Sequence, residues 1–173
     1  MKFTTETKAL SDALKKLNHS FNAKVLLPQL LNIHAEVKQG SVTLSVSDVQ
    51  TTIRYNLIAE TEGFGVFLIP FLTLKNICSV SIGKISVYLK DGATMVDCDK
   101  DFYNLGSYNT ENYIKIPKTL RTSCVVPSSV FKAMATAAMS VSTDELRPAM
   151  CLICLELKKD TVHVVATDAS SLY

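Results

Sequence analysis

Apolar and polar residues alternate cleanly over LLNIHAEVKQGSVTLSVSD, residues 30–48. Before Gln39-Gly40 one side carries Leu31, Ile33, Ala35 and Val37, and the other carries Asn32, His34, Glu36 and Lys38; afterwards Val42, Leu44 and Val46 continue the apolar side. A period of two on both sides of a glycine turn is typical of an antiparallel hairpin with one buried face.

A different period precedes this hairpin. Over residues 8–18 the apolar positions are Leu10, Ala13, Leu14 and Leu17, while Lys8, Asp12, Lys15 and Lys16 fall elsewhere. That spacing predicts an amphipathic helix. The first part of the chain is therefore interpreted as a unit of strand, helix, strand and strand.

The same unit recurs. A strand at GVFLIP (65–70) leads to a helix at FLTLKNICSV (71–80), which opens just after Pro70, and then to a hairpin over 84–98 in which Gly92 answers Gly40. A third round starts at residues 124–142, where Ser128 or Ser129 is the expected cap of a helix that carries Val130, Met134, Ala137 and Val141. It continues as the strands of RPAMCLICLELKKDTVHVVATD, residues 147–168.

The third round is an ungapped copy of the first. VTLSVSDVQT (42–51) returns as VHVVATDASS (162–171), and Pro28 and Pro148 keep the same offset of 120 residues. The sequence thus predicts an α+β fold with antiparallel sheets, two modules in a domain of residues 1–118, and the first part of a second domain in residues 119–173. KIPKTLRTS, residues 115–123, is the expected linker, and we expect the chain to be a fragment of a longer one.

Composition narrows the class of protein. Of 173 residues, 47% are hydrophobic and 20% charged, which excludes a disordered chain. No secretory signal and no membrane-spanning segment is visible, and the five cysteines lack framework spacing, so a cytosolic protein with reduced thiols is expected. The net charge is only +2, but residues 1–24 alone hold five lysines against Glu6 and Asp12.

Six short motifs, taken together, resemble the bacterial sliding clamp, the β subunit of DNA polymerase III. They are MKFT at the start, LPQLLN (27–32), GSVTLSVSD (40–48), FLIP (67–70), STDELRP (142–148) and VVATD (164–168). The resemblance implies the DNA clamp fold, with two helices and two sheets per domain. It also implies a homodimeric ring that encircles double-stranded DNA and acts as a processivity factor in DNA replication, with no active site and no cofactor of its own.

The resemblance also implies three sets of site residues. Lys15 and Lys16, off the apolar stripe of the first helix, and Lys24, where such clamps carry a basic DNA-contacting residue, are the expected DNA-binding residues; a solvated helix face is the alternative. Ile77, Tyr103 and Leu105 match the edge that closes the ring, with ordinary core packing as the alternative.

Met150, Thr167 and Leu172 match a pocket that takes short linear peptides of polymerase and clamp-loader subunits. Independently, Met150 and Leu152 would lie on the opposite strand face from Cys151, Ile153, Leu155 and Leu157. The strand would then be apolar on both sides, and the extra apolar face needs a cover, either another domain or a ligand. The chain departs from the family at Ala169, Ser170 and Ser171, where Gly-His-Arg is usual, and at Pro148 and Ala149, where two tyrosines are usual.

Other motifs indicate less. Cys151 and Cys154 are spaced like a pair of metal ligands, but in a strand residues three apart point to opposite sides. Asp97, Asp99 and Asp101 suit a charged hairpin turn better than a calcium-binding loop. Asp48 and Asp168 are expected to shape turns. Two alternatives stay open: a metal-dependent nuclease that uses Asp99, and a short clamp relative that acts as a peptide-binding decoy.

Overall fold

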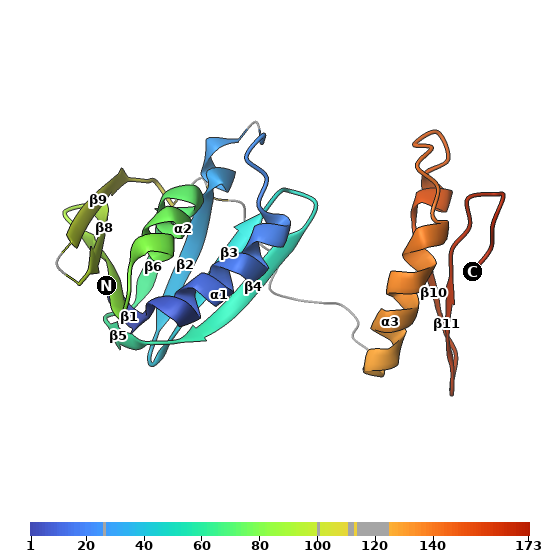
Figure 1. Ribbon diagram of the computed structural model, residues 1–173, viewed down its shortest axis with the longest axis horizontal. Coiled ribbons are helices and arrows are strands. Elements are labelled where there is room, and N and C mark those ends of the chain that lie inside the picture. The colour runs from blue at the N-terminus through green and yellow to red at the C-terminus, as the bar shows by residue number, and fades with distance from the viewer. Residues whose placement is uncertain (26, 100, 111–112, 114–124) are drawn as a thin grey trace. The chain divides into compact units, whose positions relative to one another are not determined.

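The computed structural model describes residues 1–173 apart from 26, 100, 111–112 and 114–124 (Figure 1). The chain divides into two compact units, Met1–Ile116 and Pro117–Tyr173, each of which is described by itself below. The expected linker over residues 115–123 and the expected domain boundary after residue 118 lie outside the described residues.

The first unit contains two helices and nine strands among its described residues. In chain order the elements are β1 (Lys2–Glu6), α1 (Thr7–Leu17), the 3-10 turns η1 (Asn18–Ser20) and η2 (Pro28–Leu31), β2 (Asn32–Lys38), β3 (Ser41–Ser47), β4 (Thr52–Ile58), β5 (Glu60–Glu62), β6 (Gly65–Pro70), α2 (Phe71–Val80), β7 (Lys84–Lys90), β8 (Ala93–Cys98) and β9 (Asp101–Ser107). Both predicted helices and both predicted hairpins are confirmed. The expected module was too short, because β4, β5 and β9 were not foreseen.

The strands form two antiparallel sheets, ordered β4-β3-β2-β6 and β5-β1-β7-β8-β9. Each sheet combines a three-strand meander of one module with the first strand of the other: β6 pairs with β2, and β1 pairs with β7. The two modules have therefore exchanged their first strands. Each sheet is therefore complete only when a strand from the other module is present.

The alternation in the first hairpin is confirmed. Ala35 lies opposite Leu44 and Val37 opposite Val42, and all four side chains are at most 2% exposed. Leu31 is the exception, since it lies in η2 and is 36% exposed. The reason is Pro28, which opens this 3-10 turn and delays the strand until Asn32.

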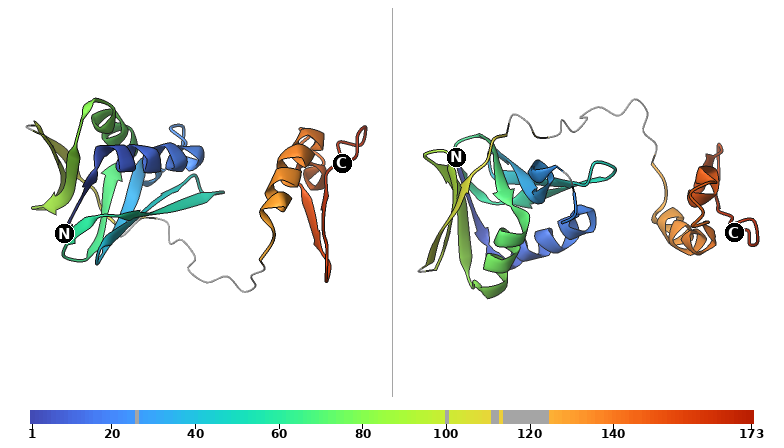
Figure 2. Two further views of the ribbon diagram at one scale, coloured as in Figure 1. Left: turned by 60° about the horizontal axis from the view of Figure 1, so that its bottom comes forward. Right: turned by 90° about the horizontal axis from the view of Figure 1, so that it is seen from above.

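Both helices bury one stripe and leave the other side to solvent. Leu10, Ala13, Leu14 and Leu17 of α1 are buried, as predicted from their spacing. Helices α1 and α2 lie side by side on the same side of the unit (Figures 1 and 2). Phe21, which follows α1, stacks on Phe71 of α2 with ring centroids 4.2 Å apart. The exposed sides of α1 and α2, together with the loop of residues 18–24, are called the helical surface below.

The second unit comprises α3 (Ser128–Ala137), the 3-10 turns η3 (Ala138–Ser140) and η4 (Pro148–Cys151), and the antiparallel pair β10 (Cys154–Leu157) and β11 (Val162–Val165). Two expectations are wrong here. The residue before α3 is Pro127, and no side chain caps the helix, so neither Ser128 nor Ser129 is its cap. The strand does not include Met150 and Cys151, because Pro148 opens a 3-10 turn as Pro28 does in the first unit.

The offset of 120 residues extends to fine detail. η1 and η3 differ by 120 residues, as do η2 and η4. Asp48 Oδ1 accepts hydrogen bonds from the amides two and three residues ahead at 3.1 and 2.6 Å, and Asp168 Oδ1 does the same at 2.8 and 2.6 Å. Val49 and Ala169 both have positive φ, 84° and 74°. The predicted turn-forming role of both aspartates is confirmed.

Candidate functional site

Positive charge gathers on the two helices of the first unit. Helix α1 carries Lys8, Lys15 and Lys16 against Asp12, and α2 carries Lys75 and no carboxylate. The remaining described residues of this unit hold six cations against nine carboxylates. The charge of the unit is thus segregated: the helices are net positive and the rest is net negative.

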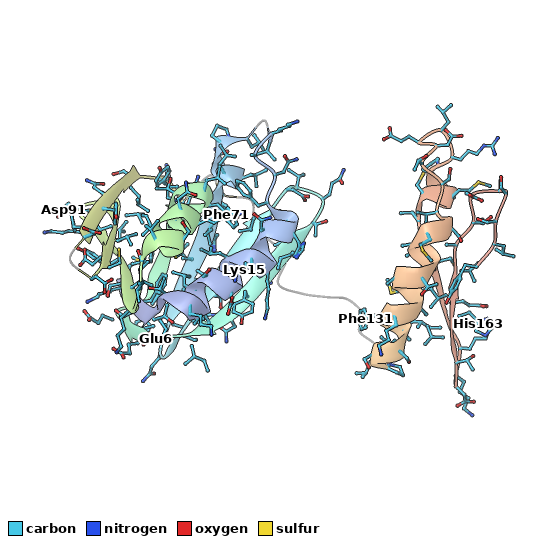
Figure 3. The ribbon with its side chains drawn as sticks, viewed as in Figure 1. Glu6, Lys15, Phe71, Asp91, Phe131 and His163 are labelled. Carbon is cyan, nitrogen blue, oxygen red and sulfur yellow. The ribbon has the colours of Figure 1, made fainter. Side chains whose placement is uncertain are left out.

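Lys15 lies on the exposed side of α1 (Figure 3). Its ammonium donates to Asp12 Oδ1 at 2.9 Å, and this bond, together with the charge of Lys15, lowers the pKa of the Asp12 carboxyl. Both side chains are more than half exposed, so the pair contributes little to stability. Its consequence is electrostatic, because the carboxylate offsets part of the positive charge of Lys15.

Lys16 and Lys24 belong to the same helical surface. The Lys16 ammonium lies 4.7 Å from the centroid of the Tyr55 ring, a cation–π contact with strand β4. Lys24 is exposed in the loop after η1, where its backbone amide donates to Asn22 Oδ1 at 2.9 Å. The structure therefore presents all three predicted lysines to solvent on the helical surface.

Sequence reasoning missed Lys75. Its ammonium donates to Asn18 Oδ1 at 3.1 Å, across a separation of 57 residues. Lys75 is the single charged residue of α2, which was visible in the sequence. Tertiary packing places α2 against α1, and Lys75 thereby becomes part of the helical surface.

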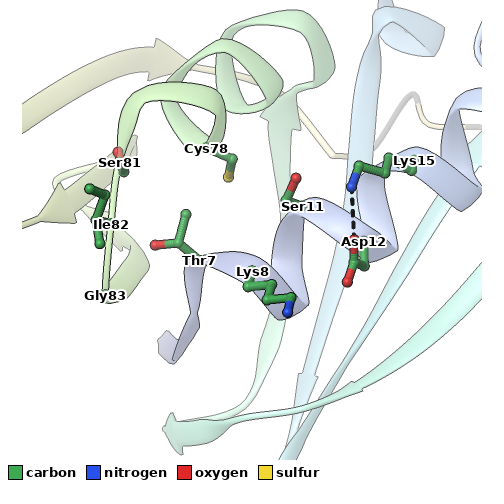
Figure 4. A pocket seen from close by; sticks show the side chains of 9 residues that line it. All are labelled: Thr7, Lys8, Ser11, Asp12, Lys15, Cys78, Ser81, Ile82 and Gly83. Carbon is green, nitrogen blue, oxygen red and sulfur yellow. Dashed lines mark hydrogen bonds and ion pairs between the residues drawn. The ribbon is translucent and has the colours of Figure 1, made fainter.

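A shallow pocket of about 270 Å³ opens between the first half of α1 and residues 81–83, beyond the end of α2 (Figure 4). Burial, and secondarily the neighbouring Cys98, raises the pKa of the Cys78 thiol in this pocket to about 12, so it stays protonated and is a poor nucleophile. The Thr7 hydroxyl is buried and has no hydrogen-bond partner among the described residues. Figure 4 shows the Lys15 ammonium directed to Asp12 and not to this hydroxyl.

The three residues expected at a ring edge occupy two different settings. Tyr103 and Leu105 lie in β9, the outermost strand of the five-stranded sheet, and are partly buried against the core. Ile77 lies in α2 and is only 5% exposed. Phe102, on the other face of β9, is 59% exposed. An unpaired edge strand with apolar side chains is available, but Ile77 packs as a core residue.

Two of the three expected pocket residues of the second unit are neighbours. Thr167 and Leu172 form an isolated antiparallel bridge, and the Thr167 hydroxyl donates to the Ser171 carbonyl at 2.6 Å. The Leu172 side chain is 76% exposed. Met150 lies in η4, half-buried, and its carbonyl accepts from the Ser142 amide at 2.9 Å.

The remaining motifs lie in a hairpin and in two separate elements. Asp97 and Asp101 belong to β8 and β9, with Asp99 in the turn that joins them, as expected for a charged hairpin. Cys151 lies in η4 and Cys154 in β10, so the expectation that both belong to one strand was wrong. No three His, Cys, Asp or Glu side chains among the described residues are grouped to hold a metal ion. Within the same residues no helix has the length and hydropathy to cross a membrane.

Comparison with known proteins places these features in a family. Residues 1–117 match the family model of the DNA polymerase III beta subunit, N-terminal domain. The beta sliding clamp of Micrococcus luteus is 26% identical over 170 residues, which cover 97% of this chain and 55% of that protein. The beta sliding clamp of Streptomyces coelicolor is also 26% identical, over 97% of this chain and 45% of that protein.

Solved structures share the fold. The DNA polymerase sliding clamp of Bacillus subtilis has a TM-score of 0.89 at 18% identity, over 98% of this chain and 48% of that one. The DNA polymerase III subunit beta of Pseudomonas aeruginosa has a TM-score of 0.90 at 18% identity, over 99% of this chain and 48% of that one. The chain spans about half the length of the curated relatives that it matches.

These likenesses confirm the predicted α+β clamp fold. The two solved clamps share the fold of this chain over 98% and 99% of its length. The chain belongs to the family of the DNA polymerase III beta subunit, the bacterial sliding clamp.

Proposed function

We propose that this chain is part of a DNA polymerase processivity factor that encircles duplex DNA as a homodimeric ring. Residues 1–118 form the first clamp domain and residues 119–173 the first part of the second. The ring is an accessory subunit without catalytic activity or cofactor, works in the cytoplasm, and tethers polymerase and clamp-loader subunits through short linear peptides.

The segregation of charge in the first unit carries this proposal. A ring that holds DNA by enclosure needs a mildly cationic lining, because many tight phosphate contacts would hinder sliding. The helical surface meets this requirement: its two helices carry four lysines, one of which is paired with Asp12. Lys15, Lys16 and Lys24 are the residues proposed to contact the phosphates.

The test is the salt dependence of duplex binding. The slope of log K against log salt is negative, and removing one lysine that neutralises a phosphate reduces its magnitude by about 0.9. Below, a lower slope means a smaller magnitude. We expect Lys15→Ala, Lys16→Ala and Lys24→Ala each to lower the slope, with the smallest effect at Lys15 because Asp12 already offsets its charge. Fluorescence anisotropy with a labelled duplex measures the slope.

Lys90 supplies the matched control. It is exposed at the end of β7, beside Asp91, which lies far from Lys15 in Figure 3. Lys90→Ala changes the net charge by the same amount but should leave the slope unchanged. If the three site variants match Lys90→Ala, the helical surface is not the DNA-contacting surface.

Encirclement has its own test. An assembled ring should stay on circular DNA and slide off once the circle is cut; equal retention on both forms would refute enclosure. The edge strand β9, with Tyr103 and Leu105 partly buried beneath it, supports closure at this edge. Ile77, the third residue expected at this edge, is 5% exposed and belongs to the core cluster, which supports the alternative of ordinary core packing.

The peptide site is proposed around Met150, Thr167 and Leu172. An exposed Leu172 beside a bridged Thr167 supports it, because an apolar side chain held by backbone pairing is suited to a peptide anchor. Leu172→Asp should abolish the binding of a short clamp-binding peptide, whereas the neighbouring Ser170→Asp should weaken it less. Equal affinity of Leu172→Asp and the parent chain would exclude this residue.

A further inference from the structure

Lys75 differs from the other cations of the helical surface in the partner that holds it. Its ammonium donates to the side-chain oxygen of Asn18, at 3.1 Å, and both residues are exposed. Asn18 is the C-terminal cap of α1 and the first residue of η1, and Lys75 lies in the middle of α2. One hydrogen bond therefore joins the two helices at the surface.

The side chain of Asn18 is a neutral amide, so it does not offset the positive charge of Lys75. Lys15 shares its charge with Asp12 through an ion pair, whereas α2 has no acidic residue. A lysine ammonium has three donors, and Asn18 takes one of them. Among the described residues, two of its donors and its full positive charge remain available, at a position that the amide restricts.

We propose that Lys75 is a further phosphate-contacting residue of the helical surface and that Asn18 is its positioning residue. This inference rests on the proposed function, since the ligand is the phosphate backbone of duplex DNA. Asn18 acts through Lys75: it restricts a flexible side chain before the phosphate arrives, so binding costs less rotamer freedom.

Four variants of the 173-residue chain test the pair by the same salt-dependent anisotropy. Lys75→Ala should lower the salt slope by about 0.9, and Lys75→Arg should keep it. Asn18→Ala should keep the slope, because the ammonium remains, but weaken binding about two- to tenfold. Asn18→Asp should lower the slope as Lys75→Ala does, because a carboxylate would pair with the ammonium.

A double variant separates positioning from a general structural role. In the Lys75→Ala background, Asn18→Ala should have no further effect on affinity. A further loss of affinity there, or a slope unchanged by Lys75→Ala, would overturn the inference. Thermal unfolding of each variant shows whether the fold is intact, and Lys75→Arg and Asn18→Asp keep the pair testable if an alanine variant does not fold.

Failure of this inference is distinguishable from failure of the proposed function. If the Lys16 and Lys24 variants lower the slope and Lys75→Ala does not, the helical surface binds DNA without Lys75. If no lysine variant differs from Lys90→Ala, both are wrong.

Discussion

At the scale of single residues, the copied turn shows how one side chain fixes a backbone. Asp48 and Asp168 each accept two amide hydrogen bonds within their own turn, and the next residue is held at positive φ. In the first copy that residue is Val49, a β-branched side chain for which positive φ is a steric outlier. The carboxylate bonds hold it there.

Relief of the backbone strain at Val49 should increase the stability of the first unit. Val49→Gly should raise the free energy of unfolding of the first unit by about 0.5–1 kcal/mol, because the left-handed region costs a non-glycine residue more than glycine adds in unfolded-state freedom. Denaturant titration followed by circular dichroism measures it. Gln50→Gly, one position further on, is the control and should destabilise; equal losses in both variants would contradict relief of strain at Val49.

The second copy of the turn predicts a pH effect. Backbone hydrogen bonds from Ser171 and Ser170, followed by the Ser171 hydroxyl, lower the pKa of the Asp168 carboxyl. A depressed folded-state pKa means that the turn is stabilised above the unfolded-state pKa of about 3.9 and loses that stability as the pH falls through the folded value. Carboxyl NMR should find Asp168 titrating below its ordinary value, and Ser171→Ala should move it upward. Titration at or above the ordinary value would exclude these bonds.

At the scale of elements, the helices begin without side-chain caps. Glu6 precedes α1 with extended backbone, φ −69° and ψ 133°, but its side chain makes no capping bond. Pro127 precedes α3 in the same way. Both helices thus depend on their buried stripe, not on their ends, and α1 has the fuller stripe.

A shorter acid should supply the missing cap. Glu6→Asp keeps the charge and places a carboxylate within reach of the first free amides of α1, which should raise the free energy of unfolding by about 0.5–1 kcal/mol. Thermal unfolding of the variant is the measurement. Glu62→Asp, in strand β5, is the matched control and should show no gain; an equal gain there would remove capping as the cause.

At the scale of the whole molecule, the exchange of β1 and β6 decides what can fold alone. Each sheet of the first unit takes strands from both modules, so the core is closed only when both are present. Phe3 of β1 and Phe67 of β6 meet with ring centroids 6.3 Å apart, one from each exchanged strand. We therefore expect the modules, although repeats in sequence, not to be independent folding units.

Separate halves test this directly. Residues 1–64 and residues 65–113 should each lack cooperative thermal unfolding by circular dichroism, and an equimolar mixture should regain it, because β1 and β6 then find their sheets. Residues 1–113 in one chain serve as the positive control. Cooperative unfolding of residues 65–113 alone would show that the exchanged strand is dispensable.

Local signals predicted much of the fold but not all of it. Helices α1 and α2 follow from apolar spacing, and the hairpin of β2 and β3 follows from alternation around Gly40. β4 was missed although Ile53, Tyr55 and Leu57 alternate; β9, with Asn104 and Gly106 inside it, has little strand signal to find. Lys15 and Lys16 were placed correctly as exposed, because a residue off the apolar stripe of a helix faces solvent.

The sequence by itself determined the periods of both helices of the first unit and of its two predicted hairpins, the 120-residue copy and the cationic start of the chain, because these follow from the order of residue types along the chain. Only the tertiary structure decided that β1 and β6 change sheets, that Ile77 is a core residue, and that Lys75 meets Asn18. Those pairings join residues far apart in the chain. Which partner each strand or helix takes depends on how the whole core closes, and no local pattern of apolar and polar residues records that choice.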